Sequence, residues 1–377
     1  MRNKLVMALK RSTALVLALG LVASVSVGCG KKQSGKNDED VFKEESAVSE
    51  LEEAEVEEEE AEEVTAKSLL TNEPLDEDRV NKRPVSIMIE NTKMALPQYG
   101  LNEAGIVYEC PAEGGITRFL ALFDNYNDMD RIGNIRSCRP YYAYIAAEYD
   151  SIYMHYGQSV HGKEVLETGI VDDLNGLDGS IERDVYFRSS DKKAPHNAYT
   201  STDGINKGIE DKGYRVEYKD GETGHFLFAE KENKLKGYDD AQVIKLYFPT
   251  NNPYYVYDSE EKLYTRYQFG AVESDAVDSN PVKTANIILQ NVTSSIYPGT
   301  QYLDITLTGS GEGKYLTRGK VMDITWSKAS NQDVTHYYDE DGNEIKLNTG
   351  KTWVHLIENA GVSKCQTYAT KEEAGVN

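Results

Sequence analysis

The chain has 377 residues, of which 63 are Asp or Glu and 41 are Lys or Arg, so its formal net charge at pH 7 is −22. A chain this acidic, with no basic stripe, does not have the composition of a nucleic-acid-binding protein, and that class is excluded. The length is sufficient for two folded domains once the terminal segments are set aside.

The N-terminus has the features of a secretory signal peptide. Residues 1–11 carry basic and no acidic side chains, and an apolar run then continues almost to Cys29. This run is shorter than the ~20 residues that a membrane-spanning helix needs. Cys29 follows small residues, which resembles the lipobox of bacterial lipoproteins, although Ser26 stands where that motif usually has Leu. We predict that residues 1–28 are the signal peptide and that lipid on Cys29 holds the protein at the extracytoplasmic face of the cell membrane. The alternative is an ordinary cleaved signal in which Cys29 is incidental.

Residues 29–78 are predicted to be an acidic, disordered tether. Between Asp38 and Glu63 the sequence contains fifteen acidic residues and one basic residue, Lys43. Such a run repels itself and has too few apolar side chains to offset the entropy of ordering. A tether would hold the folded part away from the membrane, whereas the alternative is a docking tail for a basic partner.

Residues 79–225 are predicted to form a domain of mixed strands and helices. Apolar, β-branched runs indicate the strands. A proline in the first turn or a serine cap indicates the helices. The expected strands are residues 83–91, 104–110 and 151–157, and the expected helices are residues 140–150, 159–169 and 201–213.

Residues 240–362 are predicted to form a β-rich domain. Short segments rich in Tyr and Thr alternate with turn residues, and no useful length of helical periodicity interrupts them. This spacing indicates antiparallel strands in a barrel or a sandwich. The expected fold class is therefore α+β: a mixed α/β N-terminal domain followed by a β-rich antiparallel C-terminal domain.

A hairpin is expected where two apolar runs flank the sequence Glu-Gly-Gly at residues 113–115, because adjacent glycines supply the positive φ angles of tight turns. A four-residue loop, 113–116, is favoured over a two-residue loop, which would place Pro111 where the strand ladder needs an N–H group. Alternation of side chains along a strand would then put Glu109 and Arg118 on one face. Arg118 is expected to pair with Glu109 or Glu113.

A polar site is expected in the same domain, because Arg, His and Asn side chains gather at the ends of its predicted elements. The candidate ligand-binding residues are Glu113, Arg118, Arg136, Arg139, His155, Ser159, His196 and Asn197. Arginine presents a fixed fork of donors suited to a carboxylate or phosphate, and helix N-termini also favour anions. We predict that these residues converge on a partly buried site for an anionic group. The alternative is an ion pair that only stabilises the hairpin.

Metal and cofactor chemistry has little support in the sequence. The spacing of His155, His161 and His196 matches no compact ligand motif, so neither a metal nor a cofactor is expected. Cys110 and Cys138 lie in no paired motif and are expected to be small buried apolar residues, with a disulfide between them as the alternative.

Several segments resemble the YerB-like family of bacterial lipoproteins, whose two halves are paired domains of unknown function. The resemblance extends from Arg83 to Ile357. It rests on VYECPAEGGITRFLALF (107–123), GNIRSCRPYY (133–142), APHNAYTS (194–201), GKVMDITWSK (319–328) and GKTWVHLI (350–357). It implies a bacterial, membrane-anchored protein that faces the cell wall, and it implies no particular activity.

Two functions are consistent with these features. The first is a non-enzymatic lipoprotein that binds a cell-envelope component, either an anionic ligand or a protein partner, through the polar site. The alternative is an enzyme that acts on the cell wall and uses His155 or His196 with Glu113 as an acid–base pair.

Overall fold

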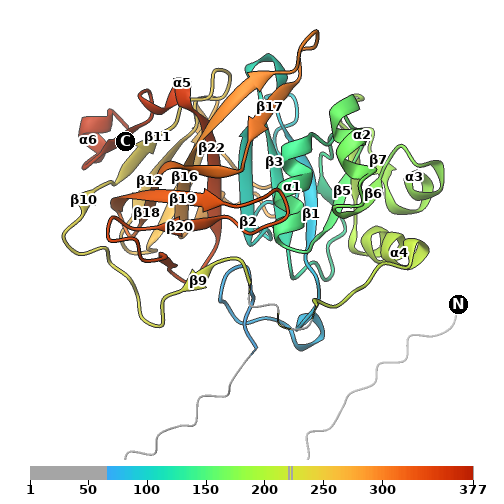
Figure 1. The fold of residues 1–377 in the computed structure, drawn as a ribbon, viewed down its shortest axis with the longest axis horizontal. Coiled ribbons are helices and arrows are strands. Elements are labelled where there is room, and N and C mark those ends of the chain that lie inside the picture. The colour runs from blue at the N-terminus through green and yellow to red at the C-terminus, as the bar shows by residue number, and fades with distance from the viewer. Residues whose placement is uncertain (1–65, 220, 222–223, 377) are drawn as a thin grey trace, which may run out of the picture. The chain divides into compact units, whose positions relative to one another are not determined.

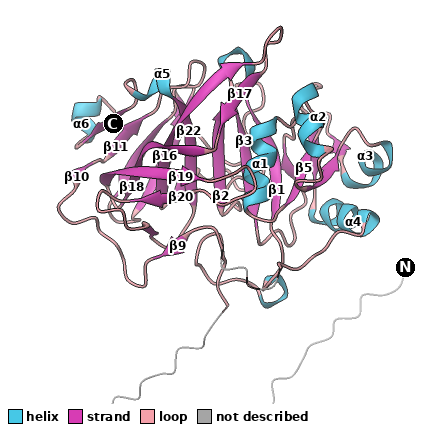
Figure 2. Ribbon diagram, viewed as in Figure 1, coloured by secondary structure: helices cyan, strands magenta, loops and turns pink. Residues whose placement is uncertain are grey.

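The computed structural model describes residues 66–219, 221 and 224–376 (Figure 1). The predicted signal peptide, Cys29 and most of the predicted tether therefore lie outside the described residues. We call residues 66–225 the N-terminal half and residues 226–376 the C-terminal half. The α+β class predicted from the sequence is confirmed, because the longer helices gather in the N-terminal half and strands dominate the C-terminal half (Figure 2).

The N-terminal half alternates strands and helices. Its elements are η1 (Glu77–Arg79), β1 (Val85–Asn91), β2 (Ile106–Pro111), η2 (Glu113–Gly115), β3 (Thr117–Phe123), β4 (Ile132–Gly133), α1 (Pro140–Glu148), β5 (Ile152–His155), α2 (Val160–Leu166), β6 (Asp172–Asn175), α3 (Gly179–Val185), β7 (Phe187–Arg188), β8 (Ala198–Thr200) and α4 (Thr202–Lys212).

The C-terminal half consists mainly of strands. Its elements are β9 (Leu227–Phe228), β10 (Asp239–Asp240), β11 (Val243–Lys245), β12 (Tyr254–Asp258), β13 (Leu263–Gln268), β14 (Ala271–Val272), β15 (Lys283–Thr284), β16 (Asn286–Ile296), β17 (Leu303–Thr306), β18 (Gly309–Thr317), β19 (Lys320–Lys328), β20 (His336–Tyr338), β21 (Lys346–Leu347), β22 (Thr352–Glu358), α5 (Asn359–Val362), β23 (Gln366–Tyr368) and α6 (Lys371–Ala374).

The three predicted helices form where their local signals place them. Pro140 occupies the first turn of α1. Ser159 caps α2 by accepting a hydrogen bond from the Gly162 N–H at 3.0 Å. Ser201 caps α4 in the same way, and α4 ends at Gly213, whose φ of 65° is the left-handed conformation that glycine adopts without strain.

The predicted hairpin is confirmed as β2 and β3, but its predicted register is wrong. The loop spans residues 112–116, and Cys110, not Glu109, lies on the face of Arg118 because these two residues are directly opposite. Glu109 faces the other side of the sheet, opposite Phe119. The five-residue loop shifts the pairing by one position, which exchanges the faces of every side chain on one strand relative to the other.

One twelve-stranded sheet runs through both halves. β2 pairs with β3 on one edge and in parallel with β22 on the other, from Ile106 opposite Thr352 to Glu109 opposite His355. β22 in turn pairs in parallel with β16. The sequence analysis placed these strands in separate domains, whereas the described residues from 66 to 376 fall within one compact unit in which backbone hydrogen bonds join the halves. Most other pairings in the C-terminal half are antiparallel, as predicted.

Both faces of the large sheet are buried near this junction. On one face, Met88 and Tyr108 belong to an apolar cluster with Tyr142 of α1. On the other face, Phe119 belongs to a cluster with Tyr255 of the smaller sheet formed by β11–β15 and β23. A sheet covered on both sides has few solvent-facing positions, so polar side chains in its strands need internal partners.

The end of the predicted tether packs against the folded unit. Leu70 is buried in an apolar cluster. Ser68 donates a hydrogen bond to Asp124, and the Gly350 N–H donates to the Thr71 carbonyl at 2.9 Å. The prediction of a disordered segment is therefore wrong for residues 66–78, because the leucines after the acidic run supply the apolar surface that the run lacks.

Candidate functional site

Glu90 and Arg118 lie at the centre of the candidate site. They are directly opposite each other on the antiparallel strands β1 and β3, so their side chains are on the same face of the sheet. The side chain of Glu90 is only 3% exposed. Glu90 was absent from the predicted set, although an acidic residue near the end of an otherwise apolar strand is a signal that sequence reasoning could have used.

The segment 134–136 brings Arg136 beside Glu90. The Glu90 N–H donates to the Asn134 carbonyl at 2.9 Å, and the Arg136 N–H donates to the Met88 carbonyl at 3.0 Å. These backbone bonds form an isolated antiparallel bridge between Ile89 of β1 and Ile135. They place the Arg136 Nε 3.6 Å from Glu90 Oε2.

His196 reaches the same carboxylate from the loop before β8. Its Nδ1 lies 2.8 Å from both oxygens of Glu90, and the Ile135 N–H donates to the Ala198 carbonyl at 2.8 Å, which fixes this loop against the segment 134–136. The side chain of His196 is 15% exposed and that of Arg136 is 21% exposed. These two side chains therefore form the solvent-accessible side of the site.

Arg139 and Glu113 form a second pair next to Arg118. The Nε and Nη2 of Arg139 donate to the two oxygens of Glu113 at 2.6 Å and 2.8 Å, which is the bidentate geometry of a strong ion pair. Burial opposes the charge of Glu113, but the hydrogen bonds and charge of Arg139, together with the charge of Arg118, lower its pKa. The hairpin loop is thus fixed to the start of α1.

Arg118 itself has an incomplete set of acceptors. Its Nη1 donates to the Ser137 carbonyl at 2.8 Å, while its Nε is buried and has no hydrogen-bond acceptor in the described part of the chain. Burial lowers the pKa of Arg118, and the neighbouring positive charge of Arg139 lowers it further. The predicted pairing of Arg118 with Glu109 is wrong, since Glu109 faces the opposite side of the sheet.

The remaining predicted residues have structural partners of their own. Both ring nitrogens of His155 are occupied, Nδ1 by the Gly157 carbonyl at 2.8 Å and Nε2 by Asp173 at 3.1 Å. Ser159 caps α2. Asn197 accepts from Arg188 at 2.9 Å and donates to a backbone carbonyl. The structure therefore brings together Glu113, Arg118, Arg136, Arg139 and His196, and it adds Glu90.

Glu109 belongs to a different polar network, which is fully buried where the halves meet. It accepts hydrogen bonds from Thr117 at 2.7 Å and from Asn251 of the C-terminal half at 2.8 Å. Its second oxygen lies 3.1 Å from the Nδ1 of His355 on β22. The side chains of Glu109 and His355 are not exposed to solvent, and their contacts join residues of the two halves.

The described residues give no support for metal or disulfide chemistry. No group of three or more His, Cys, Asp and Glu side chains among them could hold a metal ion. Cys110 and Cys138 are both free and buried, in agreement with the prediction that they act as small apolar residues. Within residues 66–376, apart from the few not described, no helix is long and apolar enough to cross a membrane.

Comparison with known proteins identifies the family. Two family models match the chain: the N-terminal domain of a protein of unknown function (DUF3048) at residues 70–215 and its C-terminal domain at residues 244–354. The first match begins at Leu70, within the segment that the sequence analysis assigned to the tether.

One relative and one solved structure extend this result. The chain is 33% identical over 305 residues to the protein named "Putative lipoprotein YerB" of Bacillus subtilis (strain 168), which covers 79% of this chain and 89% of the relative. A crystal structure of the YerB protein from Bacillus subtilis matches with a TM-score of 0.72 and 31% identity, covering 81% of this chain and all of that one. The chain therefore belongs to the DUF3048 family, in which it is similar to YerB across both halves.

Proposed function

We propose that this protein is a lipid-anchored protein on the extracytoplasmic face of the cell membrane, and that its N-terminal half binds an anionic group of a cell-envelope component. The binding groups are Arg118, Arg136 and Arg139, which we call the arginine cluster. The name of the relative supports the lipoprotein part of this proposal. The geometry of the arginine cluster supports the ligand class.

The single observation that carries the ligand class is the excess of positive charge in a largely buried place. Three guanidinium groups are accompanied by two carboxylates, Glu90 and Glu113. Glu113 is fully engaged by Arg139, and Glu90 is shared between Arg136 and His196. One guanidinium charge is therefore left without a compensating carboxylate.

Unused donors point to the same ligand class. The Nε atoms of Arg118 and Arg136 are buried and have no hydrogen-bond acceptor in the described part of the chain. A buried donor without an acceptor costs about 1–3 kcal/mol. A carboxylate or phosphate oxygen placed between these side chains would accept from them and balance the charge.

Titration of the full-length chain in detergent with acetate and with inorganic phosphate tests this proposal. We expect saturable binding of at least one of these anions, and Arg136→Gln should raise the dissociation constant about tenfold, since a charge-assisted hydrogen bond contributes about 1.5–3 kcal/mol. The matched control is Arg183→Gln, because Arg183 is an exposed arginine on α3. If neither anion binds, or if both variants bind as the unmodified chain does, the proposal is wrong.

A second candidate function, hydrolysis of a cell-wall component, is favoured by the contact between His196 and Glu90. A carboxylate that holds one ring nitrogen of a histidine orients the other nitrogen for proton transfer. The acid–base pair differs from the predicted one, because Glu113 pairs with Arg139 rather than with a histidine. Release of soluble fragments from purified cell walls by the unmodified chain, and its loss in Glu90→Gln but not in Glu210→Gln, would support this candidate. Absence of any release would exclude it for that substrate.

A further inference from the structure

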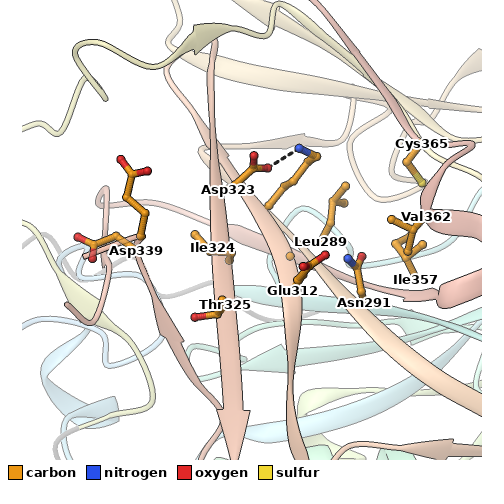
Figure 3. Close-up of a pocket in the computed structure, with 13 residues that line it drawn as sticks. Leu289, Asn291, Glu312, Asp323, Ile324, Thr325, Asp339, Ile357, Val362 and Cys365 are labelled. Carbon is orange, nitrogen blue, oxygen red and sulfur yellow. Dashed lines mark hydrogen bonds and ion pairs between the residues drawn. The ribbon is translucent and has the colours of Figure 1, made fainter. Parts of the chain in front are cut away.

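A cavity of about 420 Å³ lies in the C-terminal half (Figure 3). Its walls come from β16, β18, β19, the end of β22, α5 and the turn after β20. Leu289, Ile357 and Val362 supply its apolar surface. The volume falls in the ~300–1,000 Å³ range of pockets that bind small ligands. None of its lining residues belongs to the arginine cluster, so the two sites are separate.

The polar lining of this cavity is strongly acidic. It contains the carboxylates of Glu312, Asp323, Asp339 and Glu340 and a single cation, Lys314. Lys314 is already paired with Asp323, an ion pair that Figure 3 shows across neighbouring strands.

The other carboxylates remain uncompensated. Glu312, Asp339 and Glu340 have no Lys, Arg or His within ion-pair distance among the residues that the structure describes. Burial raises the pKa of Tyr238, and the charges of Glu340 and Asp339 raise it further, which agrees with a concentration of negative potential at this place.

We propose that this cavity docks a basic peptide segment of a protein partner, with an apolar side chain against Leu289 and Ile357 and with Lys or Arg side chains against Glu312 and Glu340. The apolar and acidic parts of the cavity lie next to each other, as Figure 3 shows for Leu289 and Glu312. A segment that carries basic and apolar residues close together matches both parts, because an apolar side chain can pack on Leu289 while a neighbouring basic group reaches Glu312.

The acidic run at residues 38–63 of the same chain does not match this cavity. It contains fifteen acidic residues and one basic residue, so its charge has the same sign as that of the cavity. A like-charged segment is repelled, whereas a basic segment gains electrostatic attraction and a faster association rate. The charge complementarity therefore selects a partner with basic residues.

Cys365 provides a local readout of binding, because this residue lines the cavity and is only partly buried, whereas Cys110 and Cys138 are buried. The experiment measures the rate at which iodoacetamide alkylates Cys365 in the full-length chain in detergent, by mass spectrometry. The probe is a blocked pentapeptide that alternates lysine and leucine. A local readout is needed because the acidic run at residues 38–63 also attracts a basic peptide without involving the cavity.

We expect the lysine–leucine peptide to slow alkylation of Cys365 in a saturable way. Glu312→Lys should raise the concentration for half-maximal protection about tenfold, since it replaces an attraction with a repulsion at an exposed site. The control Glu210→Lys changes an exposed glutamate on α4. It should leave the peptide concentration for half-maximal protection of Cys365 unchanged.

Three results would overturn the proposal. The first is the absence of protection by the lysine–leucine peptide. The second is equal protection in Glu312→Lys and in the unmodified chain. The third is protection by a glutamate–leucine peptide or by spermidine that equals the protection by the lysine–leucine peptide. Such a result would mean that the cavity does not recognise both the positive charge and the apolar side chain.

Discussion

Arg266 on β13 of the C-terminal half lies 2.9 Å from Glu109 on β2 of the N-terminal half, and neither side chain is exposed to solvent. Arg266 also pairs with Glu273 on its other side and donates to the Tyr255 hydroxyl at 3.0 Å. Two charges that are removed from water in this way depend on each other, because either one alone would remain desolvated and uncompensated. Replacing either Arg266 or Glu109 alone should therefore destabilise the protein, because it leaves the other charge buried without a partner.

Replacing Arg266 by Met should destabilise the whole unit. We expect the free energy of unfolding to fall by about 3–5 kcal/mol, the range observed when one partner of a buried ion pair is removed. Urea denaturation measures this change. Lys163→Met removes one partner of an exposed pair with Glu167 and should cost about 1 kcal/mol or less. Similar losses for the two variants would show that the buried pair adds nothing.

Stability should decrease between pH 5 and pH 7 because of Glu273. Burial raises its pKa to about 7 despite the nearby charge of Arg266, so the folded state binds a proton that the unfolded state, with an ordinary value of 4.5, releases. This contribution is fully present below pH 4.5 and is lost as pH rises through 7. Its slope is at most about 1.4 kcal/mol per pH unit.

The replacement Glu273→Gln should flatten this part of the stability profile, as measured by urea denaturation at pH 5, 6, 7 and 8. Glu260→Gln is the control, since Glu260 is exposed, and it should keep the slope of the unmodified chain. If the loss of stability between pH 5 and pH 7 persists in Glu273→Gln, Glu273 is not its cause.

Glu109 affects stability at a lower pH. Burial opposes its charge, but Arg266 and His355 lower its pKa to about 2, so its contribution to stability is lost only as pH falls from 4.5 towards 2.

Removal of residues 66–78 should lower stability, contrary to the expectation that the fold begins at Arg79. Leu70 is 1% exposed, and truncating a buried leucine costs about 2–5 kcal/mol. Thermal unfolding of chains that begin at Ala66 and at Arg79 measures the difference, which should exceed that of Met94→Ala, a change at an exposed position. Equal melting temperatures of the two truncated chains would show that the segment does not contribute to folding.

Cys29 lies outside the described residues, and its lipidation stays a prediction. Cys29→Ala should move the protein from the membrane fraction to the soluble fraction, because the predicted attachment is a covalent lipid on Cys29. Cys365→Ala, which changes a cysteine of the folded unit, should leave the protein in the membrane fraction. Fractionation that is unchanged in Cys29→Ala would exclude the lipid anchor.

Local signals in the sequence predicted much of the N-terminal half. Pro140, Ser159 and Ser201 each mark a helix start because the first turn of a helix has free N–H groups that a cap or a proline accommodates. The capping signal of Asp178 at the start of α3 is of the same kind and was missed. The family was also recognisable, because its motifs are long stretches of contiguous residues.

Non-local pairing set the limit of prediction. Whether Arg118 lies on the same face of the sheet as Glu109 depends on the length of the hairpin loop. The loop is one residue longer than expected, so the two side chains lie on opposite faces. Glu90 and His196 are far apart in the sequence, and the segment 134–136 lies between them, bonded to β1 on one side and to Ala198 on the other. Neither relationship leaves a periodic pattern, so sequence reasoning found the arginines of the site and missed the carboxylate that organises them.

The parallel pairing of β2 with β22 has a consequence for the order in which the protein acquires its structure. A ribosome delivers β2 long before β22, so the edge of β2 stays open until almost the entire chain has been synthesised. An open edge can pair with the wrong strand, including one from another molecule. A protein truncated by a late stop codon would keep every residue of the arginine cluster and still lack the strand that closes its sheet. A separately expressed first half would therefore be prone to aggregation.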